Sequence, residues 1–174
     1  MLVRVPVEAQ SGPCSQHSGN LIKNGSIDTD SVHGTQHGLV ADNWESFVLS
    51  GSPRFALVTN ENANGDIRSS AQYIYSDKHP FDAGIYQIVT NVQPGVYYSA
   101  KVGQALAAVD YGDGHNSRNG DIGRRVGVDP LGGVNPNAPS VVWGNEFHDH
   151  KPALNIPDLT ILVAAQSNRM TVFV

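Results

Sequence analysis

Short apolar runs, cut apart by clusters of Gly, Pro, Asn and Asp, recur along the chain from Asn20 onward. The 18 Gly and 10 Pro residues sit largely in these clusters, and both residue types are unfavourable inside helices. Runs of this length between turn signals are typical of the strands of sandwiches and barrels. The pattern predicts an all-β fold.

The 174 residues suffice for one domain with its own core. We expect an N-terminal arm at 1–19 and a β-domain at 20–174. Alternation and apolar runs predict strands at 20–24, 44–50, 54–59, 70–76, 84–91, 97–109, 122–128, 140–144, 158–164 and 169–174. A helix over 100–109 is the alternative there, because that stretch is rich in Ala.

Turn-forming residues predict how some of these segments are connected. Gln93-Pro94-Gly95 predicts a hairpin that joins 84–91 to 97–105, since Pro and Gly suit the two central positions of a tight turn. Asn-Gly steps such as Asn24-Gly25 favour close turns as well. The segment 31–38 is interrupted by Gly and is predicted to be a loop.

Charge and composition exclude several classes of protein. The formal net charge is -5 with both signs interspersed, so we expect no nucleic-acid partner. The best apolar run, 160–165, is too short for a membrane span. A single cysteine, Cys14, permits no intramolecular disulfide, so packing must hold the fold. The chain contains neither a G-x-S-x-G elbow nor a phosphate-binding loop, and we expect no enzyme.

Several segments, taken in order, are similar to one known family. The stretch 20–28, NLIKNGSID, is followed by Trp44, by SSAQ at 69–72 and by VQPGVYYSA at 92–100. These segments resemble galactose-binding-domain-like jelly rolls, in particular carbohydrate-binding modules of families 4, 9 and 22. The resemblance implies a two-sheet antiparallel β-sandwich that acts outside the cell, binds polysaccharide or another glycan, and carries a structural calcium ion near Asp28 and Asp30.

Aromatic rings are the first candidates for glycan contacts, because the C–H face of a sugar stacks on a flat ring. Alternation places Gln72 and Ile74 on one face of strand 70–76, and Tyr73 and Tyr75 on the other. Amides and guanidinium groups can bond to the sugar hydroxyls. The expected ligand-binding residues are Tyr75, Tyr97, Tyr111, Trp143, Gln72, Gln87 and Arg124. Tyr98 and Trp44 are expected to be structural instead.

Two further groups could hold a metal. The 110–116 stretch superficially resembles a calcium loop, but it lacks alternating acids and a closing Glu. His148 and His150 would share one face of a strand and could bind zinc, although spacing fixes no third ligand. Asp28 and Asp30 are the preferred calcium ligands.

Three functional hypotheses follow. The preferred one is a non-catalytic glycan-binding domain with millimolar to micromolar affinity, about -4 to -8 kcal/mol. The second is a structural or assembly domain of a surface or filament, in which the apolar arm Leu2 to Val7 adds a strand to a neighbouring copy and makes a homo-oligomer. The third is a small hydrolase, which would need a buried pair of carboxylates.

Overall fold

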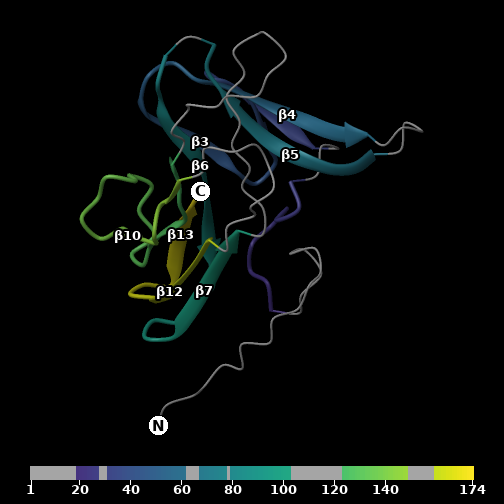
Figure 1. Ribbon diagram of the computed structural model, residues 1–174. Coiled ribbons are helices and arrows are strands. Elements are labelled where there is room, and N and C mark those ends of the chain that lie inside the picture. Colours follow the sequence, from purple (N-terminus) through teal and green to yellow (C-terminus); the bar gives the residue numbers. More distant parts are fainter. Residues whose placement is uncertain (1–18, 28–30, 62–66, 78, 103–122, 149–158) are drawn as a thin grey trace.

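The computed structural model describes residues 19–27, 31–61, 67–77, 79–102, 123–148 and 159–174 (Figure 1). Every regular element among them is a strand. The strands are β1 (Val32–Thr35), β2 (Gly38–Ala41), β3 (Glu45–Ser50), β4 (Arg54–Glu61), β5 (Ile67–Tyr75), β6 (Asp82–Thr90), β7 (Tyr97–Val102), β8 (Gly123–Arg124), β9 (Gly127–Asp129), β10 (Val142–Trp143), β11 (Phe147–His148), β12 (Leu159–Ala164) and β13 (Arg169–Phe173). The described part contains no helix that could cross a membrane.

The strands form a five-stranded sheet in the order β10-β9-β13-β6-β3 and a four-stranded sheet in the order β1-β2-β4-β5. Two further pairs, β12–β7 and β11–β8, complete the described strands. All pairings are antiparallel except that of β2 with β4. The chain is therefore an all-β protein with several, mostly antiparallel sheets, as the run pattern predicts.

The central strand β6 shows the alternation that sequence predicts. Ile85, Gln87 and Val89 are only 6%, 4% and 6% exposed, whereas Ile88 on the other side is 41% exposed. The side that carries these three buried residues is called the inner face of the five-stranded sheet. The side that carries Tyr86 and Ile88 is called its outer face.

The core lies along the inner face as two clusters. The first packs β6, β9 and β13 against β7 and β12, and the second packs β3 and β6 against β2, β4 and β5. Ile22 contacts both clusters. In Figure 1 the β4–β5 ribbon accordingly lies at one end of the central strands, and the β7–β12 pair lies at the other.

The predicted strand 20–24 is wrong, because this stretch forms turns and irregular backbone. The side-chain amide of Gln87 takes the place of a neighbouring strand. It accepts a hydrogen bond from the Lys23 N–H at 2.7 Å and donates to the Lys23 carbonyl at 2.8 Å. Antiparallel partners exchange the same two bonds. Asn24 then enters the left-handed region, with φ at 48°, and ends the extended course of the chain.

The predicted hairpin between 84–91 and 97–105 is also wrong, although its turn is present. The Val96 N–H donates to the Gln93 carbonyl at 3.1 Å, and Gly95 has a φ of 83°. Yet β6 pairs with β3 and β13, and β7 pairs with β12. The turn carries the chain from one sheet to another, because its backbone bonds to Ala165 rather than continuing the β6 ladder.

The segment 31–38, predicted to be a loop, instead contains β1 and the turn into β2. Thr35 pairs with Gly38 across a two-residue loop. The Thr35 hydroxyl accepts from the His37 N–H and donates to the Gly38 carbonyl, which stabilises that loop. Gly38, with φ at 128°, is required here, because a Cβ would collide with the Phe55 carbonyl. The glycines interrupt the apolar pattern without interrupting the strands.

The other predicted strands are present with shifted ends. Segment 122–128 divides into β8 and β9, and the described part of 97–109 is the strand β7 rather than a helix. Residues 103–109 lie outside the described part. Tyr98 is structural, as expected, since its hydroxyl accepts a hydrogen bond from the Gln93 N–H at 2.9 Å. Trp44, 5% exposed, lies in the second cluster and donates to the Asn24 carbonyl.

Candidate ligand-binding face

One row of directly opposed residues crosses the outer face of the five-stranded sheet. Trp143 is paired with Gly127, Gly127 with Phe173, Phe173 with Tyr86, and Tyr86 with Glu45. Directly opposed residues of antiparallel strands project their side chains to the same face. The ladder therefore gathers aromatic rings from three strands on one surface, which we call the aromatic face.

Phe173 is the centre of the aromatic face and is fully buried. The rings of Phe47, Tyr86 and Trp143 surround it, each with its centroid 5.9 Å from that of Phe173. These three rings are only partly buried. Phe173 thus forms the buried centre against which the three more exposed rings pack.

Two glycines make room for the outer rings. A Cβ on Gly127 would lie 2.5 Å from the Trp143 ring, and one on Gly84 would lie 2.7 Å from the Phe47 ring. Such distances are far shorter than van der Waals contact. Each ring therefore lies directly over a glycine of the neighbouring strand, and the absence of a side chain there shapes the face.

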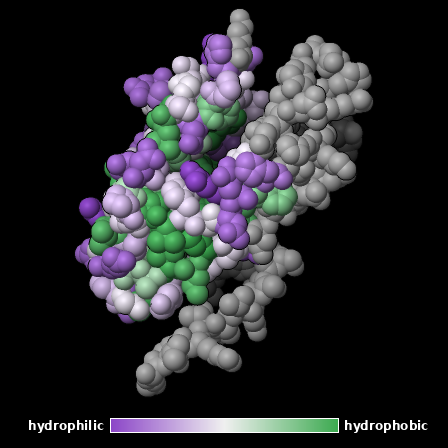
Figure 2. Space-filling view, turned by 60° about the vertical axis from the view of Figure 1, so that its left-hand side comes forward, coloured by the Kyte–Doolittle hydropathy of each residue, from purple (hydrophilic) through white to green (hydrophobic). Residues whose placement is uncertain are grey.

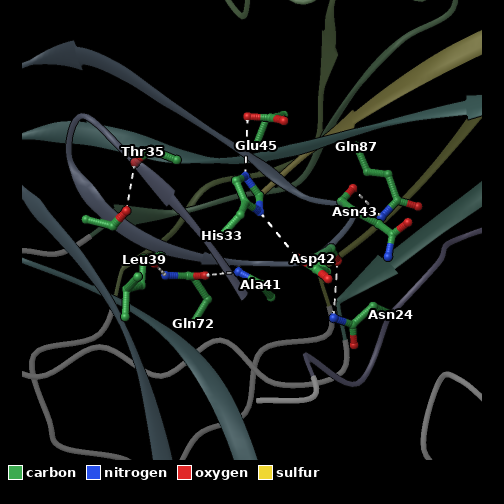
Figure 3. Close-up of polar contacts among 11 residues, drawn as sticks. Asn24, His33, Thr35, Leu39, Ala41, Asp42, Asn43, Glu45, Gln72 and Gln87 are labelled. Carbon is green, nitrogen blue, oxygen red and sulfur yellow. Dashed lines mark hydrogen bonds and ion pairs between the residues drawn. The ribbon is translucent and has the colours of Figure 1, made fainter. Parts of the chain in front are cut away.

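Charged groups flank the rings at both ends of the row. The Arg125 guanidinium lies 4.1 Å from the Trp143 ring centroid, and the Trp143 Nε1–H donates to the Pro136 carbonyl. At the other end, Glu45 lies beside Tyr86 and 3.7 Å from the His33 ring, which also faces Asp42 at 3.5 Å (Figure 3). The aromatic face thus has a cation at one end and a carboxylate at the other.

The pKa of the Tyr86 hydroxyl is raised, chiefly by burial and secondarily by the negative charge of Glu45. Both causes disfavour the tyrosinate form. Tyr86 therefore keeps its proton at neutral pH and can donate a hydrogen bond to a ligand. This combination of neutral donor, ring surface and nearby carboxylate suits the hydroxyl-rich face of a sugar.

Of the predicted ligand residues, the two glutamines bond to the protein itself. The Gln72 amide accepts from Ala41 N–H and donates to the carbonyls of Leu39 and Ala56 (Figure 3). It thereby bridges β2 and β4, whose ladder includes a single residue pair. Gln87 bonds to Lys23 on one side and to the Asn43 carbonyl on the other.

The remaining predicted residues do not converge on one site. Tyr75 stacks on Tyr73, with centroids 4.8 Å apart, on the four-stranded sheet. Tyr97, 60% exposed, lies on β7, and Arg124 lies over the Phe147 ring beside β11. Only Trp143 belongs to the aromatic face. Tyr111, Asp28, Asp30 and His150 lie outside the described residues, as do the arm 1–18 and the 110–116 stretch.

The sequence did not predict Phe47, Tyr86, Phe173 or Arg125 as members of this face. The alternation of 84–91 places Tyr86 opposite the buried residues, and this was the one available signal. No local pattern shows that the strands of Phe47, Tyr86 and Trp143 lie in one sheet, since 96 residues of sequence separate Phe47 from Trp143. Among the described residues, no three potential metal ligands come together.

Comparisons with protein-family models, with curated proteins and with solved structures give no match for this chain. The all-β assignment accordingly depends on the strands themselves and on their pairing.

Proposed function

We propose that this chain is a non-catalytic glycan-binding domain, built as the two-sheet jelly roll of carbohydrate-binding modules and acting outside the cell. The observation that carries the proposal is the aromatic face, where rings from four strands lie between a guanidinium and a carboxylate. The sandwich is supported by the core, which lies between the inner face of one sheet and the strands that cover it.

The proposed mechanism combines stacking with hydrogen bonds. The C–H faces of a sugar chain lie on the partly exposed rings of Tyr86 and Phe47, with Trp143 at the end of the row. The Tyr86 hydroxyl and the Glu45 carboxylate bond to sugar hydroxyls. Phe173 and the two glycines hold the rings in place before the ligand arrives, which lowers the entropic cost of binding.

A glycan array with plant, fungal and bacterial glycans tests this proposal. We expect binding that the Trp143→Ala variant weakens about tenfold, because a ring contact and its anchoring of Arg125 are lost. Tyr75→Ala is the matched control, since it removes an aromatic ring from the other large sheet. Thermal unfolding of both variants verifies that they are folded. Loss of binding in Tyr75→Ala alone would move the site to the four-stranded sheet, and silence across the array would refute the proposal.

A specific surface favours the assembly hypothesis as the second candidate. Leu162 and Tyr97 are 63% and 60% exposed, and they lie on the same side of the β7–β12 pair. Figure 2 shows that apolar side chains also gather into a continuous patch on the face that it presents. Contiguous exposed apolar surface is typical of contacts between proteins.

The mass of the protein in solution tests the assembly hypothesis. An oligomer that becomes a monomer when residues 1–18 are removed supports assembly through the arm. An oligomer that survives this truncation but dissociates in Leu162→Asp places the contact on the β7–β12 pair instead. If the protein and both variants are monomers at concentrations where the array shows binding, the assembly hypothesis is refuted and the glycan-binding proposal is the one that stands.

A further inference from the structure

Arg125 lies at the end of the aromatic face and has no carboxylate partner in the described part of the chain. The ion pairs there involve His33 and His148, and the contact of Arg125 is with the Trp143 ring. A partly buried guanidinium has lost some of its water, so its donors gain from meeting an anion. The guanidinium of Arg125 is therefore suited to bind a negatively charged group of a ligand.

The position of Arg125 is fixed from both sides. Its side chain stacks on Trp143 at 4.1 Å, and the next residue, Val126, is 1% exposed. The Val126 carbonyl also accepts a hydrogen bond from the Gly144 N–H at 2.8 Å, which ties this backbone to the strand end after Trp143. A stacked guanidinium presents its fork of N–H groups in a fixed plane, and that fork matches the two oxygens of an oxyanion.

The opposite end of the row sets the polarity of the ligand. Glu45 lies there, beside Tyr86, and would repel a second anion. The row crosses five strands, a span of about 19 Å for four steps of about 4.8 Å each. A ligand longer than a single sugar ring can therefore place its anion at Arg125 and only hydroxyls near Glu45.

We propose that the aromatic face takes an acidic glycan, whose oxyanion (a uronate carboxylate or a sulfate ester) is bound by Arg125 while its sugar rings lie along the partly exposed rings of Trp143 and Tyr86. The inference rests on the proposed glycan-binding function and adds the substrate class. Arg124 does not share this role, because its guanidinium lies over Phe147 on the neighbouring β8–β11 pair.

Calorimetric titration with three probes tests the inference: a uronic-acid oligosaccharide, the same oligosaccharide with its carboxyl groups reduced to alcohols, and a sulfated neutral oligosaccharide. We expect at least one acidic probe to bind about tenfold more tightly than the reduced one, with an advantage that shrinks as salt rises. The probe that shows the advantage identifies the source of the oxyanion.

Arg125→Gln should abolish that advantage, so that the acidic and the reduced probe bind this variant with equal affinity. Arg125→Lys should keep part of it, because the charge remains and the planar fork is lost. Arg169→Gln is the matched control, since Arg169 is exposed and begins β13, away from the aromatic row. Thermal unfolding of each variant verifies folding.

Equal affinity for acidic and reduced probes would overturn the inference and leave the glycan-binding proposal standing. An acidic preference that persists in Arg125→Gln would also overturn it, because another cation would then bind the anion. Failure of all three probes together with a silent glycan array would overturn the proposed function, and this inference with it.

Discussion

Two glutamine amides, those of Gln72 and Gln87, bond to backbone groups that the strand ladders leave without partners. A primary amide carries the same donor and acceptor as a peptide group, so it can stand in for a neighbouring strand. Sequence alone predicted both residues as ligand contacts, because a polar residue at an inner position is compatible with either role. Their hydrogen bonds to backbone groups of neighbouring segments favour the structural role.

Replacing Gln87 by Leu should lower the free energy of unfolding by about 2 kcal/mol. The substitution keeps the volume but leaves the Lys23 and Asn43 backbone groups without their partners. Urea unfolding measures this change. Gln166→Leu, at an exposed position, is the control and should change stability by less than about 0.5 kcal/mol. Equal stability of the two variants would contradict the bridging role of Gln87.

Tyr86 should make stability depend on alkaline pH. Its folded pKa is raised above the usual value of about 10, by burial first and Glu45 second, so the folded state holds a proton that the unfolded state releases. The contribution is therefore complete below pH 10 and is lost as pH rises further. The stability difference between the native protein and Tyr86→Phe should fall above pH 10, and Glu45→Gln should reduce that fall. A pH-independent difference would refute the raised pKa.

At the level of elements, alternation and turn residues predicted most strands but not their partners. The segments 44–50, 54–59, 84–91 and 169–174 are strands because their apolar residues alternate or cluster. The predicted pairing was wrong where strands that are adjacent in sequence do not pair in the sheet. The Gln93–Val96 turn depends only on nearby residues, whereas the partner of β7 is β12, about sixty residues away. The β1–β2 hairpin within 31–41 was not predicted, because its glycines interrupt the apolar pattern that identifies strands.

Gly127→Ala should disturb β9 and β10 together. The new Cβ would meet the Trp143 ring, which is held by Arg125 and Phe173 and cannot simply swing away. We expect a loss of about 1–3 kcal/mol in unfolding free energy and weaker glycan binding. Gly34→Ala is the control, since a Cβ there meets nothing within 4 Å and the strand conformation suits Ala. Similar effects of the two variants would argue against close packing of Trp143 on Gly127.

At the level of the whole molecule, one central sheet carries both the core and the candidate site. Its inner face contacts two other sheets, and its outer face carries the rings. Sequence predicted the all-β class because strand period is a local property, and it identified Trp143 as a candidate residue. It could not assemble the aromatic face, because that surface exists only once β3, β6, β13 and β10 lie in one sheet.

Calcium remains a prediction of the family resemblance. If Asp28 and Asp30 bind calcium, a chelator should lower Tm and added calcium should restore it, since an ion that binds only the folded state stabilises it. Differential scanning calorimetry measures this shift, and Asp28→Asn should remove it. A Tm that changes with neither chelator nor added calcium would exclude a stabilising calcium ion.

The central claim, that glycan binds on the aromatic face, is tested most directly by tryptophan fluorescence. The chain has two tryptophans, buried Trp44 and partly exposed Trp143. Titration with a glycan that the array identifies should change the emission of the native protein saturably, and Trp143→Phe should abolish this change. Tight binding of that glycan with no change in emission, or with a change that persists unaltered in Trp143→Phe, would contradict the account.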